Sequence, residues 1–347
     1  MRALTIEAHG GTERIRFRED LAVPELAARD QVRLRMRSVG LNRLDLFTVG
    51  GLPGVTITPP WILGADGCGD VDQVGADVAS VAVGERVVIN PGLSCRTCEY
   101  CRRGEQPLCP KYGILGEHHP GTFAEYVVVP AANVRRISSS VPDDVAAAFT
   151  LAHLTAWRMC VTRAQVKAGE TVLIWGVGGG VAQAALGICK ARGARVIVTS
   201  SSAQKLARAK ALGADEGIDH SSAEVGRVVR ELTGKRGADV VIDSVGERTW
   251  THSLQSLGRG GRLVTCGGTS GPLLTMDVRR LFWYQWSILG STMGNDAEFD
   301  AVVAELAAGR LKPAIDRVLP LAEGRAAFER MAAGAQFGKI VLRVRDD

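Results

Sequence analysis

The sequence reads Thr171-Val-Leu-Ile-Trp175, then Gly176-Val-Gly-Gly-Gly-Val-Ala182, then Gln183-Ala-Ala-Leu-Gly-Ile-Cys-Lys-Ala191. The first run is short and apolar, as in a buried strand, and the last places Ala185 and Ile188 on one face at helical spacing. A strand, a glycine turn and a helix N-terminus form an anion site, because amide N–H groups and the helix dipole face the turn. The spacing Gly176-x-x-Gly179-x-x-Ala182 predicts a dinucleotide-binding turn.

A second buried strand over 194–200 follows where a βαβ unit requires one. An Asp or Glu at its end would accept a hydrogen bond from the ribose 2′-hydroxyl of NAD. Here hydroxyl groups and an ammonium group stand there instead, which suits a 2′-phosphate and favours NADP(H) over NAD(H); the candidate contacts are Ser200, Ser201 and Lys205. The serines also suit the N-terminal cap of a helix over 203–212, and both interpretations can hold.

Strands and helices alternate over the rest of this region. Strand-like runs at 216–219, 240–244, 262–266 and 287–292 are separated by helical stretches, which predicts a doubly wound parallel sheet. Because ligands bind at the carboxyl ends of such strands, further cofactor contacts are expected at Val245, Gly267, Gly268 and Ser291.

The segment before residue 140 is β-rich, with strand-like runs separated by Gly and Pro turns at 1–7, 31–39, 86–89 and 123–130. In one of them Arg33, Arg35 and Arg37 alternate with apolar residues, as on the wet face of a half-buried strand. The tail has a helix near 297–308 and a strand at 339–344. It is too short for a further domain, so we expect it to fold onto the N-terminal one.

The composition is that of an enzyme of the cell interior. The 347 residues suffice for two domains, and 46% apolar with 23% charged residues is ordinary for a globular protein. A net charge of +5 without a long basic block gives no reason to expect nucleic acid as a partner. No apolar segment approaches the roughly 20 residues that span a bilayer. No apolar stretch precedes Glu7, so we expect no signal peptide and a cytoplasmic location.

Four of the eight cysteines lie in one loop, as Cys95-x-x-Cys98-x-x-Cys101 and then Cys109. Two Cys-x-x-Cys steps with a fourth cysteine nearby match a closed tetrahedral Cys₄ site, so we predict one structural zinc per chain. Disulfides are the alternative, against which a reducing cytoplasm argues, and an iron–sulfur cluster has no specific support. The others are expected to be buried thiols: Cys68, Cys160, Cys189 and Cys266.

With Gly64-Ala-Asp-Gly-Cys-Gly69 and Gly121-Thr-Phe-Ala-Glu-Tyr126, these motifs resemble the medium-chain dehydrogenase/reductase superfamily over essentially the whole chain. The resemblance implies an α/β protein with a GroES-like β-rich catalytic domain, formed by 1–140 and 293–347, and a Rossmann NADP-binding domain over 141–292. It places the active site between them and implies a homodimer or homotetramer. It also assigns the pyrophosphate to Gly176, Gly178, Gly179, Gly180 and Val181.

The departures from the family pattern concern a catalytic metal. Zinc alcohol dehydrogenases of this superfamily carry a Cys where this chain has Asn42, a His where it has Ala65, and a third ligand near Leu151. Zinc needs thiolate, imidazole or carboxylate donors, and none of these three residues supplies one. The resemblance therefore implies that the catalytic zinc is gone, as in the quinone oxidoreductase branch, where an Asn replaces the cysteine.

Without a Lewis acid, nothing lowers the pKa of an unactivated alcohol. A quinone or an α,β-unsaturated carbonyl compound accepts hydride at carbon and leaves its negative charge on an oxygen, which hydrogen-bond donors stabilise. We therefore expect an NADPH-dependent reductase of small electrophilic substrates. Asn42 is the candidate for orienting the carbonyl, unless it only caps a turn. Asp45 positions Asn42 or faces water, Asp66 holds hydrogen bonds, and His153 faces the nicotinamide or is a core residue.

Two other functions stay open. Asp66, His118 and His119 could hold a recruited metal in an alcohol dehydrogenase, although Glu117-His118-His119 is also typical of a solvated loop tip. The second open function is that of a non-catalytic NADPH-binding protein. Lys339 could approach the cofactor, but a surface lysine is the simpler interpretation.

Overall fold

The computed structural model describes residues 1–345 and divides the chain into two compact units. The first comprises Met1–Ala152, Gly294–Gly309 and the segment from Pro313 onward, and the second comprises His153–Met293 and Arg310–Lys312. Residues 141–152 thus lie in the first unit and not with the cofactor domain, because helix α3 (Asp143–Ala147) packs against strands of the first unit. No helix in the described part is long and apolar enough to cross a membrane.

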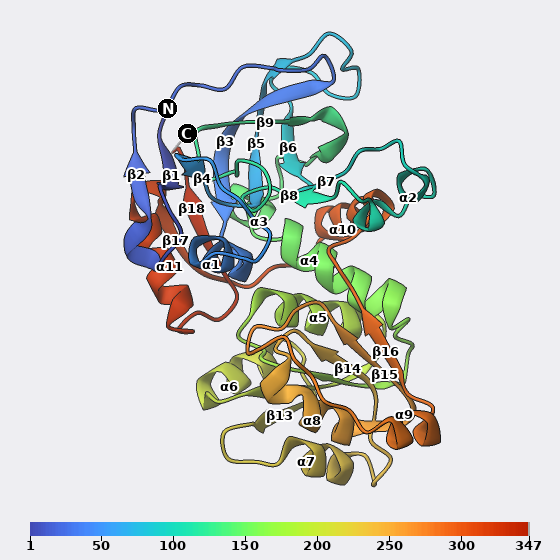
Figure 1. Ribbon diagram of the computed structural model, residues 1–347. Coiled ribbons are helices and arrows are strands. Elements are labelled where there is room, and N and C mark those ends of the chain that lie inside the picture. Colours follow the sequence, from blue (N-terminus) through green and yellow to red (C-terminus); the bar gives the residue numbers. More distant parts are fainter. Residues whose placement is uncertain (346–347) are drawn as a thin grey trace. The chain divides into compact units, whose positions relative to one another are not determined.

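The first unit is built on a seven-stranded sheet (Figure 1). Its strands run in the order β10-β6-β5-β3-β18-β17, and β9 also pairs with β3. Their bounds are β3 Gln31–Gly40, β5 Asp66–Val74, β6 Arg86–Ile89, β9 Tyr126–Pro130, β10 Val134–Arg136, β17 Ile315–Pro320 and β18 Lys339–Arg343. Because β17 and β18 come from the C-terminal tail, the tail completes the N-terminal domain, as expected.

Smaller elements surround this sheet. A three-stranded sheet has the order β2-β1-β4, and β7 pairs with β8. The bounds are β1 Ala3–Ile6, β2 Arg16–Arg18, β4 Trp61–Ile62, β7 Gly92–Leu93 and β8 Gly113–Ile114. The other α-helices are α1 Arg43–Gly50, α2 Glu99–Arg102, α10 Asp296–Ala307 and α11 Gly324–Ala332.

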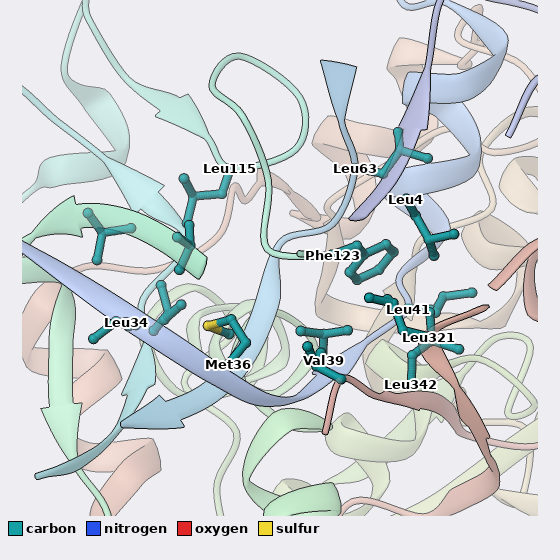
Figure 2. Packing of buried hydrophobic residues seen from close by; sticks show 14 of the residues in the cluster. Leu4, Leu34, Met36, Val39, Leu41, Leu63, Leu115, Phe123, Leu321 and Leu342 are labelled. Carbon is teal, nitrogen blue, oxygen red and sulfur yellow. The ribbon is translucent and has the colours of Figure 1, made fainter. Parts of the chain in front are cut away.

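The core of the first unit follows the alternation along β3 as far as Met36, and Val39 joins the same cluster after a register shift between Met36 and Ser38. Leu34, Met36 and Val39 are fully buried in one cluster with Phe123 (Figure 2), whereas Arg35 between them is exposed. Beside this core, Gly64 has a φ of +98°, and a Cβ there would lie 2.1 Å from the Phe123 ring. Only glycine satisfies both constraints at the position that leads the chain into β5.

The second unit has a six-stranded parallel sheet of order β13-β12-β11-β14-β15-β16, the doubly wound arrangement predicted from the sequence (Figure 1). Its strands are β11 Thr171–Ile174, β12 Arg195–Ser200, β13 Glu216–Asp219, β14 Ala238–Asp243, β15 Leu257–Thr265 and β16 Ser287–Gly290. Its helices are α5 Gly180–Ala191, α6 Ala203–Ala211, α7 Val225–Leu232, α8 Glu247–Ser256 and α9 Val278–Tyr284. Helix α4, Thr150–Trp157, starts in the first unit and enters the second.

Candidate functional site

Three strand ends meet at one end of the seven-stranded sheet. Gly40 of β3 pairs with Asp66 of β5 on one side and with Val341 of β18 on the other. The next residue, Leu41, donates its amide to the carbonyl of Ile340 over 2.9 Å. This register brings together three side chains that are far apart in the sequence, here called the strand-end cluster: Asn42, Asp66 and Lys339.

Asp66 accepts hydrogen bonds on both carboxylate oxygens. The Thr150 hydroxyl donates to Oδ1 over 2.5 Å, and the Leu151 amide donates to the same atom over 2.7 Å. Oδ2 lies 2.8 Å from Lys339 Nζ. Asp66 is completely buried, so these donors replace the water that an ionised carboxylate requires. In this arrangement both carboxylate oxygens of Asp66 act as hydrogen-bond acceptors.

Asn42 occupies the N-cap position of α1, which agrees with the helix-capping interpretation of its backbone. Its side chain does more, because Oδ1 accepts a hydrogen bond from Lys339 Nζ over 2.5 Å. Asn42 Nδ2 lies 3.4 Å from the carbonyl of Gly40. The amide is therefore held at its oxygen, and one N–H of its nitrogen is directed to Gly40, which leaves the second N–H as a donor for a ligand.

Asp45 is buried and does not face water. Its Oδ2 accepts the backbone amide of Asn42 over 2.7 Å, which fixes the start of α1. Burial raises the pKa of Asp45 to about 7, against the lowering effect of the Asn42 amide and of the Lys339 charge. Asp45 is thus a carboxyl group that titrates near neutral pH beside the strand-end cluster.

Lys339 corrects the expectation of a surface lysine. Its exposed fraction is 3%, and its ammonium group contacts both Asn42 and Asp66. The residue begins β18, whose neighbour in the sheet is β3, and its own amide donates to Ala314 over 2.8 Å. No motif spacing in the sequence predicts that Lys339 is buried, because the C-terminal tail and β3 meet only in the folded sheet.

The remaining catalytic candidates are placed as follows. His153 is buried in α4 and belongs to the second unit, and its role toward the nicotinamide stays a prediction. His118 Nδ1 accepts the Ile114 amide over 3.3 Å and lies 3.9 Å from Glu117. Burial raises the pKa of Glu117 and lowers that of His119. Within residues 1–345, this loop joins no group of three or more side chains that could hold a metal.

The glycine turn has the geometry of an anion site. Gly176 adopts a φ of +65°, and Gly179 is the N-cap of α5. A Cβ at Gly176 would meet nothing within 4 Å, and one at Gly179 would approach only the Gly176 carbonyl, at 3.6 Å. The space above the turn is therefore open to a ligand, and Gly180 and Val181 begin the helix whose N-terminus faces it.

The helix-capping interpretation of the serines is confirmed at the end of β12, whereas the 2′-phosphate interpretation stays a prediction. Ser202 caps α6 by accepting the Lys205 amide over 3.3 Å. The Ser200 hydroxyl accepts the Ser202 amide over 3.1 Å, and Ser201 is exposed. The residue that follows β13, His220, donates its amide to the Ser200 carbonyl. His220 therefore joins this end of the sheet, although the sequence interpretation did not include it.

A cavity of about 530 Å³ adjoins the glycine turn within the second unit. Gly176 and Val245, both predicted contacts, line it, and so do three basic residues that sequence reasoning missed: His220, Arg248 and His252. Their positions directly after β13 and in α8 follow the strand-end rule, which would have found the first of them. Only one carboxylate residue, Glu224, lines the same cavity, and it lies 3.5 Å from His252.

The other predicted contacts follow neighbouring strands. Gly267 and Gly268 form an exposed loop after β15, which reaches the loop after β14 through the bond from the Ser270 amide to the Val245 carbonyl. Ser291, after β16, donates its amide to Thr265 over 2.9 Å, and its hydroxyl is buried with no hydrogen-bond partner among the described residues. An unsatisfied buried hydroxyl suits a polar ligand at this end of the sheet.

The four clustered cysteines fit a metal. Their sulfur atoms all lie within 4.8 Å of one another. The amide of Lys111 donates to Cys109 Sγ over 3.3 Å, and the Thr97 amide and hydroxyl lower the pKa of the Cys95 thiol to about 5. Such donors stabilise thiolates, the form that binds zinc. Of the other thiols, Cys266 is only partly buried, which corrects that expectation.

A second set of contacts ties this cysteine loop to the rest of the first unit. Arg96, inside the loop, pairs with Asp296 at the start of α10 over 2.7 Å. Gln106 donates to the same carboxylate over 3.3 Å. The loop is therefore anchored to α10 by an ion pair and a hydrogen bond, which suits a structural role.

Two family models match the chain: an alcohol dehydrogenase GroES-like domain over residues 28–139 and a zinc-binding dehydrogenase domain over 180–308. A crystal structure of an NAD-dependent alcohol dehydrogenase is 43% identical with a TM-score of 0.95, and the match covers 99% of this chain and 100% of that one. An NAD-dependent alcohol dehydrogenase of Sulfolobus acidocaldarius is 30% identical, with 99% and 100% covered. A quinone oxidoreductase of Pseudomonas aeruginosa is 31% identical, with 96% and 97% covered.

The chain therefore belongs to the medium-chain dehydrogenase/reductase superfamily, in its zinc-containing alcohol dehydrogenase-like group, and is an oxidoreductase. The predicted combination of a GroES-like domain with a parallel-sheet domain is confirmed.

Proposed function

We propose that this protein reduces quinones or α,β-unsaturated carbonyl compounds with NADPH, without a catalytic metal. The observation that supports the proposal is the state of Asn42, whose side-chain oxygen accepts from Lys339 and whose nitrogen has one N–H directed to the Gly40 carbonyl and a second N–H to offer to a substrate oxygen. Ala65 and Leu151, which stand at the other family ligand positions, have no donor atoms, so these three residues do not fit a zinc ion.

When bound, a reduced nicotinamide supplies a hydride to an electron-poor carbon of the substrate. Negative charge then develops on the substrate oxygen, and Asn42 Nδ2 donates a hydrogen bond to it. The Asn42 backbone is fixed by Asp45 and its amide oxygen by Lys339, so this donor is in place before the reaction begins. A proton from solvent completes the reduction at the neighbouring carbon, or at the oxygen of a quinone.

NADP(H) is supported by the chain at the end of β12, where Ser200, Ser201 and Ser202 stand in place of a carboxylate. Arg248, which lines the adjoining cavity, adds a positive charge. His220 lines this cavity too, but burial lowers its pKa and so favours the uncharged ring. Two of the relatives are named NAD-dependent, which makes the choice of cofactor a sharp test of this reasoning. The pyrophosphate is assigned to the open turn at Gly176 and Gly179.

The cysteine loop is proposed to hold one zinc that has a structural role only. All four ligand positions of a tetrahedral ion would be protein thiolates, which leaves none for a substrate. Reduced thiols also agree with a cytoplasmic location, and the family resemblance leads us to expect a homodimer or homotetramer.

The central experiment follows the oxidation of NADPH by the purified protein with a panel of quinones and enones. We expect turnover, and deuterium from position 4 of labelled NADPH should appear on the β-carbon of an enone product. Tight NADPH binding without turnover on any acceptor would refute the enzyme proposal. Oxidation of simple alcohols at higher rates, lost after removal of a second metal ion per chain, would establish a metal-dependent alcohol dehydrogenase instead.

The cofactor assignment is tested with Ser200→Asp. A carboxylate at the end of β12 should repel a 2′-phosphate and accept from a ribose hydroxyl, so the kcat/KM ratio of NADPH to NADH should fall at least about tenfold. Ser139→Asp adds the same charge on an exposed loop of the first unit and should leave the ratio unchanged. An unchanged ratio in Ser200→Asp would mean that the 2′-phosphate lies elsewhere.

A further inference from the structure

The strand-end cluster contains a buried cation at the place where the family resemblance puts a metal. Lys339 is 3% exposed, and its Nζ lies 2.8 Å from Asp66 Oδ2 and 2.5 Å from Asn42 Oδ1. Asn42 is the residue that replaces the cysteine ligand, and Asp66 follows the residue that replaces the histidine ligand. A divalent ion at this place would meet the ammonium group as a like charge.

Both carboxylate oxygens of Asp66 already accept hydrogen bonds from the protein. Thr150 and the Leu151 amide engage Oδ1, and Lys339 engages Oδ2. A buried carboxylate whose oxygens are both satisfied is a stable partner for one ammonium group. The pair therefore fixes Lys339 in position, and the remaining contact of its ammonium group is with Asn42.

The contact with Lys339 decides which way the Asn42 amide points. An ammonium group only donates hydrogen bonds, so the atom 2.5 Å from Lys339 Nζ has to be the amide oxygen. In the flipped orientation, the NH₂ group would face the ammonium group at the same distance. The lysine thus determines that Asn42 presents an N–H donor, and not an acceptor, to its surroundings.

We propose that Lys339 is a positioning residue that stands in for the catalytic metal: it fixes the Asn42 side chain so that Nδ2 donates to the substrate oxygen. This inference rests on the proposed function, because the donor has a use only where negative charge develops on an oxygen. It adds a specific dependence that the proposed function does not require, namely that Asn42 works only while Lys339 holds its oxygen.

A double-mutant cycle tests this dependence under saturating NADPH. Lys339→Met should lower kcat for the best acceptor by about 10- to 100-fold, and Asn42→Ala should have an effect of similar size. If Lys339 acts through Asn42, adding Lys339→Met to Asn42→Ala should change kcat by less than about threefold. If the kcat losses of the two single variants multiply in the double variant, the proposal is overturned. A Lys339→Met defect confined to the Kd or KM of NADPH would also overturn it.

Two variants separate this role from a general need for charge balance. Lys339→Arg keeps the charge and should retain more activity than Lys339→Met. Because Lys339→Met leaves Asp66 unpaired and buried, the double variant Asp66→Asn/Lys339→Met provides a form without a net buried charge. This form should fold, as judged by its thermal unfolding, and still lack most of the turnover. Full activity in a folded Asp66→Asn/Lys339→Met protein would overturn the proposal.

A spectroscopic measurement works even if no acceptor is found. The chain has only four asparagines, at positions 42, 90, 133 and 295, so selective ¹⁵N-asparagine labelling yields four side-chain amide signals. The Asn42 signal is identified by its loss in Asn42→Asp, and we expect a large shift of that signal in Asp66→Asn/Lys339→Met. An Asn42 signal that does not move would overturn the inference, whereas a moved signal in a protein without turnover would refute only the proposed function.

Discussion

Replacing Asp45 by Asn should remove a loss of folding stability that the wild-type protein undergoes as the pH rises. Burial raises the pKa of Asp45 to about 7 from its ordinary value of 3.8, so the folded protein keeps a proton that the unfolded chain has released. The titration of Asp45 therefore leaves the free energy of unfolding unchanged below pH 4. It lowers that free energy as the pH rises from 4 to 7, and the loss is complete above the folded-state pKa. The difference between the two pKa values corresponds to about 4 kcal/mol in all, of which roughly 2.5 kcal/mol is lost between pH 5 and pH 8.

Urea unfolding at a series of pH values measures this effect. Asp45→Asn keeps an oxygen that can accept the Asn42 amide and removes the titration. The free energy of unfolding of the variant relative to the wild-type protein should rise by about 2.5 kcal/mol from pH 5 to pH 8.

Asp20→Asn is the matched control, because the Asp20 side chain is 70% exposed and its pKa is lowered by Arg18. That variant should show no such rise. A stability difference between wild type and Asp45→Asn that is the same at every pH would mean that Asp45 is ionised in the folded protein throughout, and the argument from burial would be wrong.

Three further predictions concern the fold and the cysteine loop. Cys109→Ser should lower the zinc content, measured by elemental analysis, from about one ion per chain to well below one, and a full complement of zinc would exclude Cys109 as a ligand. Gly64→Ala should lower the free energy of unfolding by more than about 1 kcal/mol, because φ is +98° and the Cβ would lie 2.1 Å from Phe123. Gly50→Ala, whose Cβ meets nothing within 4 Å, is its control and should have little effect. Phe123→Ala should cost about 3–5 kcal/mol in urea unfolding, and a loss below about 1 kcal/mol would show that its cluster repacks around the gap.

The parallel sheet could be predicted from the sequence because its information is local. Each strand of the second unit is a short apolar run followed by its own turn and helix, which predicts parallel strands joined by crossover helices, whereas their order comes from the structure. The cysteine cluster is local as well, since its ligands lie within 15 consecutive residues, Cys95 to Cys109. In both cases, residues that are close in the chain meet in the fold.

The motifs that resemble the family predict that its three catalytic zinc ligands are absent, but they do not predict which side chain contacts Asn42 and Asp66 instead. Asn42 and Asp66 could be named from motifs, whereas Lys339 is separated from Asn42 by 297 positions and was expected on the surface. His220 directly follows the strand predicted at 216–219 and could have been found from the sequence, whereas its contact with Ser200 depends on the register of β12 and β13.

Lys339 lies inside the first unit because of strand pairing and not because of its local sequence. The C-terminal strand β18 pairs with β3, and this pairing carries the first residue of β18 next to Asn42 and Asp66. A lysine prefers water unless a buried carboxylate and a carbonyl oxygen compensate for the loss of its hydration. The partners of Lys339 come from segments distant in sequence. The local sequence pattern therefore indicates an exposed lysine, although strand pairing buries it.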